Sequence, residues 1–268
     1  MKNFYGIIQG RLTKSNELQC FPLDNWANEF SLANKLKYSF IELLTERVHN
    51  KNNPFWTAEG INQYKKLIID NSLINYSVCA DYIIDNSLIG EDSIIHNAYL
   101  NNFIDKCIIM KCPVIILPFL EKNEFTKNNI HKYAEILKKL SKKISQFNMM
   151  ICIETLLDAK NLKEFLSNVN KDNIKCVYDT GNRAMLNNNL NYEIKHLNNM
   201  IGHVHIKDKN LNGENVILGQ GTVDFNEAFD SLKHIDYSGP YVFETTRGLD
   251  PIKTATSNIE FCNYFLNN

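Results

Sequence analysis

The 268-residue sequence has no cysteine pair spaced C-x-x-C and no long hydrophobic run. No apolar stretch approaches the ~18 residues that suggest a membrane-spanning helix. Residues 1–10 are too short and too polar a segment for a secretory signal peptide. The seven cysteines are an odd number in a long chain, which is not the pattern of a disulfide framework. These absences predict a cytoplasmic protein whose cysteines are reduced and mostly buried.

The sequence also has almost no net charge, because 29 Lys and Arg residues oppose 30 Asp and Glu residues. A balance near neutrality gives no electrostatic signal for binding nucleic acid or an anionic membrane. Hydrophobic residues at 44% and aromatic residues at 11% exclude a disordered chain. Linker-like Gly/Ser/Pro tracts and internal repeats are missing as well. We therefore predict one globular domain over residues 1–268, without nucleic-acid or membrane partners.

Short apolar runs of strand length alternate with longer amphipathic segments along the whole chain. The runs predict strands at 5–9, 40–43, 73–79, 114–117, 149–154, 176–179, 202–206 and 241–244. The amphipathic segments predict helices at 25–36, 58–70, 92–111, 125–147, 160–169, 190–199, 225–235 and 251–266. Strands that alternate with helices pair in parallel through right-handed crossovers. Eight such units predict an α/β fold, a closed (β/α)8 barrel, for which roughly 250 residues are typical. The asparagine-rich run 187–191 predicts a polar loop, and residues 218–224 predict a tight loop that reaches over the barrel mouth.

Four side chains that can bind a metal each stand at the end of an apolar run: Glu154, Asp179, His205 and Glu244. Neighbours in this set are separated by about one β/α unit, which needs roughly 30 residues. The C-terminal ends of parallel strands meet at one end of a barrel, where such barrels keep their active sites. A carboxylate that ends a strand can also be a mere turn former, but three carboxylates and one histidine at the ends of successive strands favour a common site.

Strand parity supports this hypothesis, because side chains two residues apart lie on the same face of a strand. The intervening positions, such as Ile153, Val204 and Phe243, are apolar and would meet the helices. The polar ends would therefore face the barrel mouth. His203 shares a face with His205 but lies two residues deeper, so we predict that it is a core histidine or supports a ligand from behind, and is not itself a ligand.

Two Glu, one Asp and one His make a ligand set that is mostly oxygen. This set suits Mn²⁺ or Mg²⁺, is compatible with Co²⁺ or Zn²⁺, and differs from the thiolate-rich set of structural zinc. One such ion could bind two substrate oxygens and stabilise an enediolate while carboxylates move a proton next to a carbonyl. Glu154 and Glu244 are the candidates for this acid–base role.

Other polar side chains follow the predicted strands and are candidates for binding substrate. They are Gln9, Arg11, Glu42, Asp81, Asn182, Lys207 and Arg247. The three cations among them could hold a phosphate or carboxylate of an anionic substrate. Alternatively, they pair with Glu42, Asp81 and Asp208 and brace the loops.

Eight short motifs, in order, resemble those of a known superfamily. They are Gly6-Ile-Ile-Gln-Gly-Arg-Leu12, Phe40-Ile-Glu42, Val78-Cys-Ala-Asp81, Cys152-Ile-Glu154, Tyr178-Asp-Thr-Gly-Asn182, Gly202-His-Val-His-Ile-Lys-Asp208, Leu218-Gly-Gln-Gly221 and Phe243-Glu-Thr-Thr-Arg247. Together they resemble the xylose-isomerase-like barrels, a superfamily of sugar-phosphate isomerases and epimerases that also contains the endonuclease IV enzymes. In its ketose 3-epimerases, the residues that match the four candidate ligands bind one divalent metal, and the two Glu exchange the proton. The resemblance implies the same roles here.

Two departures from the epimerase pattern concern the substrate. Asn182 stands where those epimerases have a histidine, and Leu211 stands where they have an arginine. Both family residues contact sugar, which argues against a simple free ketose. Asn182 also replaces a zinc ligand of endonuclease IV, and the chain is not basic, so we do not expect DNA repair. The chain is more similar to members encoded with surface-polysaccharide and acidic-sugar biosynthesis.

We therefore predict an isomerase or epimerase that acts on a small sugar or an anionic sugar derivative with one divalent metal. A homodimer is left open. Two alternatives remain: an inosose-type dehydratase that uses the same chemistry with loss of a hydroxyl, and a barrel that binds sugar without catalysis.

Overall fold

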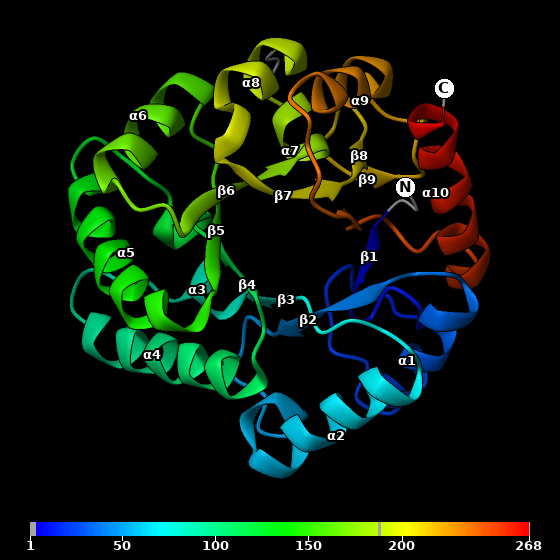
Figure 1. The fold of residues 1–268 in the computed structure, drawn as a ribbon, viewed down its shortest axis with the longest axis horizontal. Coiled ribbons are helices and arrows are strands. Elements are labelled where there is room, and N and C mark those ends of the chain that lie inside the picture. The colour runs from blue at the N-terminus through cyan, green and yellow to red at the C-terminus, as the bar shows by residue number, and fades with distance from the viewer. Residues whose placement is uncertain (1–3, 187–188, 268) are drawn as a thin grey trace.

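Eight parallel strands close into a barrel that is surrounded by helices (Figure 1). The computed structural model describes residues 4–186 and 189–267. The barrel strands are β1 (Tyr5–Ile8), β2 (Phe40–Thr45), β3 (Ser77–Ala80), β4 (Val114–Pro118), β5 (Met150–Glu154), β6 (Ile174–Asp179), β7 (Ile201–Ile206) and β10 (Tyr241–Phe243). Each strand pairs with the next barrel strand along the chain, and β10 pairs with β1. The predicted (β/α)8 barrel is confirmed, and its closure leaves no free sheet edge.

The helices that cover the barrel follow the predicted positions closely. They are α1 (Trp26–Lys35), α2 (Ala58–Asp70), α4 (Ser93–Met110), α5 (Ile130–Ile144), α6 (Ala159–Val169), α8 (Leu190–Leu197), α9 (Phe225–His234) and α10 (Pro251–Leu266). Helix α5 begins later than predicted, because the Asn129 side chain accepts from the Thr126 N–H and forms a turn there. Over the described ranges, no helix is both long and apolar enough to cross a bilayer.

Several short elements are absent from the sequence-based prediction. They are α3 (Tyr82–Asp85), α7 (Thr180–Ala184), the antiparallel pair β8 (Asp208–Lys209) and β9 (Asn215–Val216), and the 3₁₀ turns η1 (Pro54–Trp56), η2 (Glu121–Asn123), η3 (Ser145–Phe147) and η4 (Asn198–Met200). The predicted loop 187–191 is partly wrong. Residues 187–188 lie outside the described residues, but Leu190 already begins α8 because the Asn189 side chain caps the Tyr192 N–H.

The apolar core has an outer layer and a filled barrel interior. Outward-facing strand residues such as Ile7, Ile153 and Val204 pack against the helices. Two smaller clusters lie apart from that layer: Cys79, Val114, Ile116, Cys152 and Val177, and Ile8, Phe40 and Val242. All seven cysteines are free, and six of them are buried. The interior is therefore a packed core, and polar side chains gather at one end of it.

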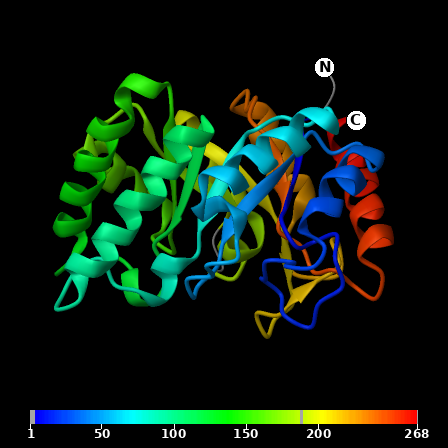
Figure 2. The ribbon, with the colours of Figure 1, turned by 90° about the horizontal axis from the view of Figure 1, so that it is seen from below.

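The loop after β1 and the β8–β9 hairpin project from the same end of the barrel (Figure 2). A tight loop follows the hairpin, as predicted for residues 218–224, and folds around the buried carboxylate of Asp208. Oδ2 of Asp208 accepts from the N–H groups of Gly219 and Gly221 at 2.9 and 2.8 Å. Oδ1 accepts from Lys209 and Val223 at 2.9 and 3.2 Å. One side chain thus fixes the loop by four backbone contacts.

We expect Asp208→Asn to lower the free energy of unfolding by about 2 kcal/mol, because the amide nitrogen would face two N–H donors and leave them unsatisfied. Urea unfolding would measure the change. Asp224→Asn is the matched control, since exposed Asp224 accepts from the Glu227 N–H at the start of α9. Asn caps a helix about as well as Asp, so the control should be nearly neutral. Equal, small effects at both positions would contradict the role of Asp208.

Candidate metal centre

The structure brings the four candidate ligands together at the C-terminal ends of the strands. Glu154 ends β5, Asp179 ends β6, His205 lies near the end of β7, and Glu244 directly follows β10. One possible ligand atom from each residue lies within 4.8 Å of the others. The first three side chains are buried, and Glu244 is partly exposed. We call these four residues the carboxylate cluster; their role as ligands stays a prediction.

The atoms at the centre of the carboxylate cluster have close contacts but no well-formed hydrogen bonds. His205 Nδ1 lies 3.0 Å from Glu244 Oε2, 3.9 Å from Asp179 Oδ2 and 4.0 Å from Glu154 Oε2. Among the residues that the structure describes, His205 Nδ1, Asp179 Oδ2 and Glu244 Oε2 are buried without a hydrogen bond of good geometry, although the two carboxylate oxygens form ion pairs with Lys207. Buried polar atoms are normally satisfied. Three that converge, two of them carboxylate oxygens, fit a divalent cation.

Lys207 belongs to the same cluster of charges. Its Nζ lies 2.9 Å from Asp179 Oδ2 and 3.0 Å from Glu244 Oε2. Burial lowers the pKa of Lys207, but the charges of Asp179 and Glu244 outweigh it and raise the pKa above its usual value. The ammonium therefore stays charged and neutralises part of the acidic cluster.

The two glutamates differ in their affinity for a proton. Burial and the charges of Glu244 and Asp179 raise the pKa of Glu154 to about 8. Burial also acts to raise the pKa of Glu244, but Lys207 and His205 bring it well below its usual value. Neighbouring carboxyl groups whose pKa values are pushed apart are typical of an acid–base pair. Without a metal, Glu154 would hold a proton near neutral pH and Glu244 would be ionised.

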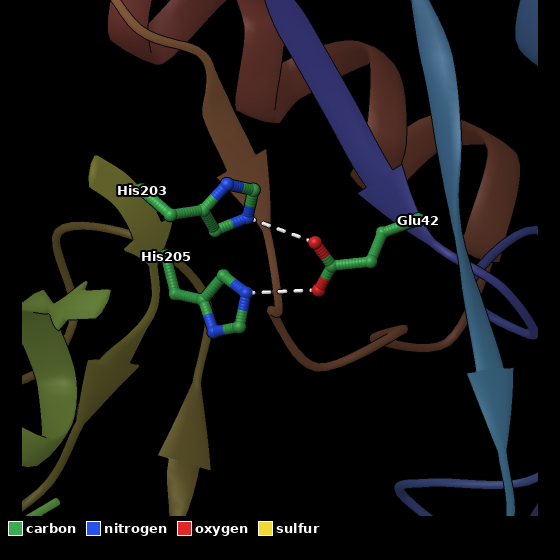
Figure 3. Close-up of side chains that lie close together, drawn as sticks. All are labelled: Glu42, His203 and His205. Atoms are coloured by element: carbon green, nitrogen blue, oxygen red, sulfur yellow. Dashed lines mark hydrogen bonds and ion pairs between the residues drawn. The ribbon is translucent and has the colours of Figure 1, made fainter. Parts of the chain in front are cut away.

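Glu42 contacts both histidines of β7 (Figure 3), and one of them, His205, belongs to the carboxylate cluster. Its Oε1 is 2.9 Å from His205 Nε2, and its Oε2 is 2.8 Å from His203 Nε2. The Ser77 hydroxyl donates to Oε2 at 2.6 Å. His203 is fully buried and faces Glu42. Protein groups thus engage both oxygens of Glu42, a residue that the sequence suggested as a substrate contact.

The two predicted arginines of the mouth hold the loop after β1. Arg11 donates to the Leu18 carbonyl and, at 2.7 Å, to Gln19 Oε1. Arg247 donates to the carbonyls of Gly10 at 2.7 Å and Leu18 at 3.0 Å. These contacts agree with the bracing alternative, except that the acceptors are mostly backbone carbonyls instead of the carboxylates of Glu42, Asp81 and Asp208.

Glu29, which the sequence patterns did not predict as part of the site, is a buried carboxylate of α1 that holds the same loop. It accepts from the N–H groups of Gly10 at 2.7 Å and Leu12 at 3.0 Å, and from the Thr13 hydroxyl at 2.8 Å. A glutamate on the apolar face of a helix is the signal that could have revealed it.

The remaining candidate substrate residues lie at different depths. Gln9 is fully buried and contacts Tyr64 and the Leu44 N–H. Asn182 is partly exposed and donates to Glu154 Oε1 at 2.7 Å.

Burial raises the pKa of Asp81 to about 6. Asp81 lines a cavity of about 320 Å³ beside the loop after β1, with Gln19, Cys20 and Glu46 among its other walls.

The comparisons with known proteins agree with this architecture. The family described as xylose isomerase-like TIM barrel matches residues 30–264. A curated relative, L-ribulose-5-phosphate 3-epimerase UlaE of Salmonella paratyphi A, is 37% identical over 67 residues. That match covers 25% of this chain and 24% of the relative, so the chain spans only about a quarter of the relative's length.

Two solved structures are similar over nearly the whole chain. A xylose isomerase domain protein from Planctomyces limnophilus has a TM-score of 0.78 at 15% identity and covers 99% of each chain. D-psicose 3-epimerase from Clostridium cellulolyticum H10, solved with D-tagatose, has a TM-score of 0.78 at 16% identity, over 98% of this chain and 99% of that one. At these identities the similarity shows the shared fold.

Proposed function

Because the chain belongs to the xylose isomerase-like TIM barrel family, we propose that it is a metal-dependent sugar isomerase or epimerase that moves a proton on the carbon next to a carbonyl. The observation that carries this proposal is the carboxylate cluster, with its converging Asp179 Oδ2, His205 Nδ1 and Glu244 Oε2 atoms. The similarity of one segment to an L-ribulose-5-phosphate 3-epimerase supports the same reaction class.

Glu154, Asp179, His205 and Glu244 would hold one divalent cation, for which Mn²⁺ or Mg²⁺ suits the oxygen-rich set best and Co²⁺ or Zn²⁺ is compatible. The cation would supply Lewis acidity that stabilises negative charge on substrate oxygens. The chain itself supplies the proton transfer. Glu154 and Glu244 stand at the ends of different strands at the same mouth, so one can take a proton from a carbon while the other returns it on the opposite side.

Two neighbouring side chains would assist these glutamates. Asn182 donates to Glu154 Oε1 and so fixes the direction of that carboxyl group. Lys207 keeps a positive charge beside Asp179 and Glu244. This charge favours the ionised form of Glu244 and stabilises any negative charge that develops next to it.

The substrate would be a small sugar or a sugar derivative. Gln19, Glu46 and Asp81 surround the cavity beside the mouth and offer hydrogen-bond acceptors of the kind that bind sugar hydroxyls. Arg11 and Arg247 are engaged by backbone carbonyls, so an acidic group of the substrate would depend mainly on Lys207. We propose a single-domain cytoplasmic enzyme with a role in surface-polysaccharide or acidic-sugar metabolism.

Removal of the metal tests this proposal. In D₂O, the Mn²⁺-loaded protein should incorporate deuterium next to the carbonyl of one of a panel of ketoses, ketose phosphates and acidic sugars. After treatment with a chelator the exchange should stop, and added Mn²⁺ should restore it. Binding of Mn²⁺ should also raise the melting temperature, since a ligand that binds only the folded state stabilises it.

The outcomes separate the alternatives. Loss of water from the product would indicate a dehydratase. Sugar binding without exchange or conversion would indicate a barrel without catalysis. A wild-type protein whose melting temperature and exchange do not respond to any of the four divalent metals would contradict the proposed metal centre.

A further inference from the structure

The carboxylate of Glu42 lies against both histidines of β7 inside the barrel (Figure 3). Glu42, His203 and His205 are each at most 1% exposed. Oε1 of Glu42 is 2.9 Å from His205 Nε2, and Oε2 is 2.8 Å from His203 Nε2. Each oxygen therefore faces the Nε2 atom of a different ring, at hydrogen-bonding distance.

The chemistry of these groups determines where the ring protons must be. An ionised carboxylate can only accept hydrogen bonds. Two imidazole nitrogens within 2.9 Å of such oxygens must carry protons, because otherwise lone pairs would face each other. In a neutral imidazole with a proton on Nε2, the lone pair lies on Nδ1. In His205 that atom lies 3.0 Å from Glu244 Oε2, on the side of the carboxylate cluster. By the same argument it also carries a proton while Glu244 is ionised and no metal is bound, and a cation in the cluster would take the place of that proton.

We propose that Glu42 is a positioning residue, which holds the Nε2 proton of His205 and thereby presents the Nδ1 lone pair to the carboxylate cluster. The need for a ligand nitrogen there rests on the proposed function; the direction of the hydrogen bond does not. Ligand histidines commonly donate their other N–H to a carboxylate, and loss of that partner typically costs 10–100-fold in metal affinity.

Ser77 makes the two oxygens of Glu42 unequal. Its hydroxyl donates to Oε2, and His203 Nε2 lies 2.8 Å from the same oxygen without good hydrogen-bond geometry, whereas His205 Nε2 faces Oε1. A glutamine has only one acceptor oxygen, and the Ser77 hydroxyl together with the nearby His203 ring favours it at the Oε2 position. The amide NH₂ would then face His205 Nε2, which could stay there only as an acceptor. The ring proton would move to Nδ1, where it blocks coordination.

The test is the protonation of the histidine rings in protein labelled with ¹⁵N-histidine, observed by NMR. In the wild type, Nε2 of His205 should be protonated both without metal and with diamagnetic Zn²⁺. In Glu42→Gln, Nε2 of His205 should lose its proton, and the affinity for Mn²⁺ should fall at least about tenfold. Ser77→Ala is the matched control, because it removes a contact of Oε2 but keeps the carboxylate. It should preserve both the protonation and the affinity.

Two results would overturn the proposal. One is a wild-type His205 with an unprotonated Nε2. This measurement needs no variant, so it tests the proposal even if Glu42→Gln does not fold. The other is a folded Glu42→Gln protein with the Mn²⁺ affinity of the wild type. A wild-type protein that binds no divalent metal would instead reject the proposed function, while its metal-free NMR spectrum would still report whether Glu42 accepts from His205.

Discussion

Glu244→Gln should lower turnover by about 10²–10⁴-fold, the usual cost of losing a positioned acid–base group, and leave the fold intact. The amide oxygen can still coordinate a metal, but an amide does not take up a proton at neutral pH. Glu244 directly follows β10, and its N–H is bonded to the Ile206 carbonyl, so the change affects only the end of a side chain. Deuterium exchange from solvent into the substrate, followed separately from net conversion, would measure the loss.

The control for this experiment is Glu260→Gln, the same chemical change at an exposed position of α10. It should leave exchange and conversion unchanged. The Mn²⁺ content of Glu244→Gln must be measured in parallel, since loss of the metal would also stop the reaction. If the metal-loaded variant exchanges deuterium at the wild-type rate, Glu244 is a ligand only, and the proposed proton transfer is wrong.

Glu193→Leu is expected to lower the free energy of unfolding by about 3–5 kcal/mol, the typical cost of breaking a buried ion pair. Arg183 and Glu193 lie on α7 and α8, and their side chains are only 3% and 2% exposed. The guanidinium meets the carboxylate at two points, Nε with Oε2 at 2.8 Å and Nη2 with Oε1 at 2.5 Å. Without the carboxylate, a buried positive charge would lose the group that neutralises it.

The double variant Glu193→Leu with Arg183→Met is the matched control, because two apolar side chains often replace a buried ion pair at little cost. Urea unfolding should place it closer to the wild type than the single variant. Asp70→Leu removes an exposed pair with Lys66 on α2 and should change stability little. If Glu193→Leu is at least as stable as the double variant, the ion pair between Arg183 and Glu193 does not hold α7 in place. Because α7 also carries Asn182, the single variant should disturb the Glu154 contact as well.

The sequence predicts the barrel and the positions of its long elements because both depend on local patterns. Strand-length apolar runs alternate with amphipathic segments, and the strands that result can pair in parallel only through crossovers. Glu154, Asp179, His205 and Glu244 end such runs, and the ends of parallel strands meet at one mouth. Helix α7 and the β8–β9 hairpin could not be predicted in the same way, since two to five residues are too few to show a period.

What the sequence by itself determines is therefore which side chains reach the barrel mouth, and only the tertiary structure decides what each of them contacts there. Glu42 meets His205 across 163 positions of the sequence, and Arg247 meets the Gly10 carbonyl across 237. Their place at the mouth predicts that both bind substrate, yet protein groups engage them. The physical reason is that a strand pattern fixes the face of a side chain, whereas its partner depends on the distances between residues that folding brings together.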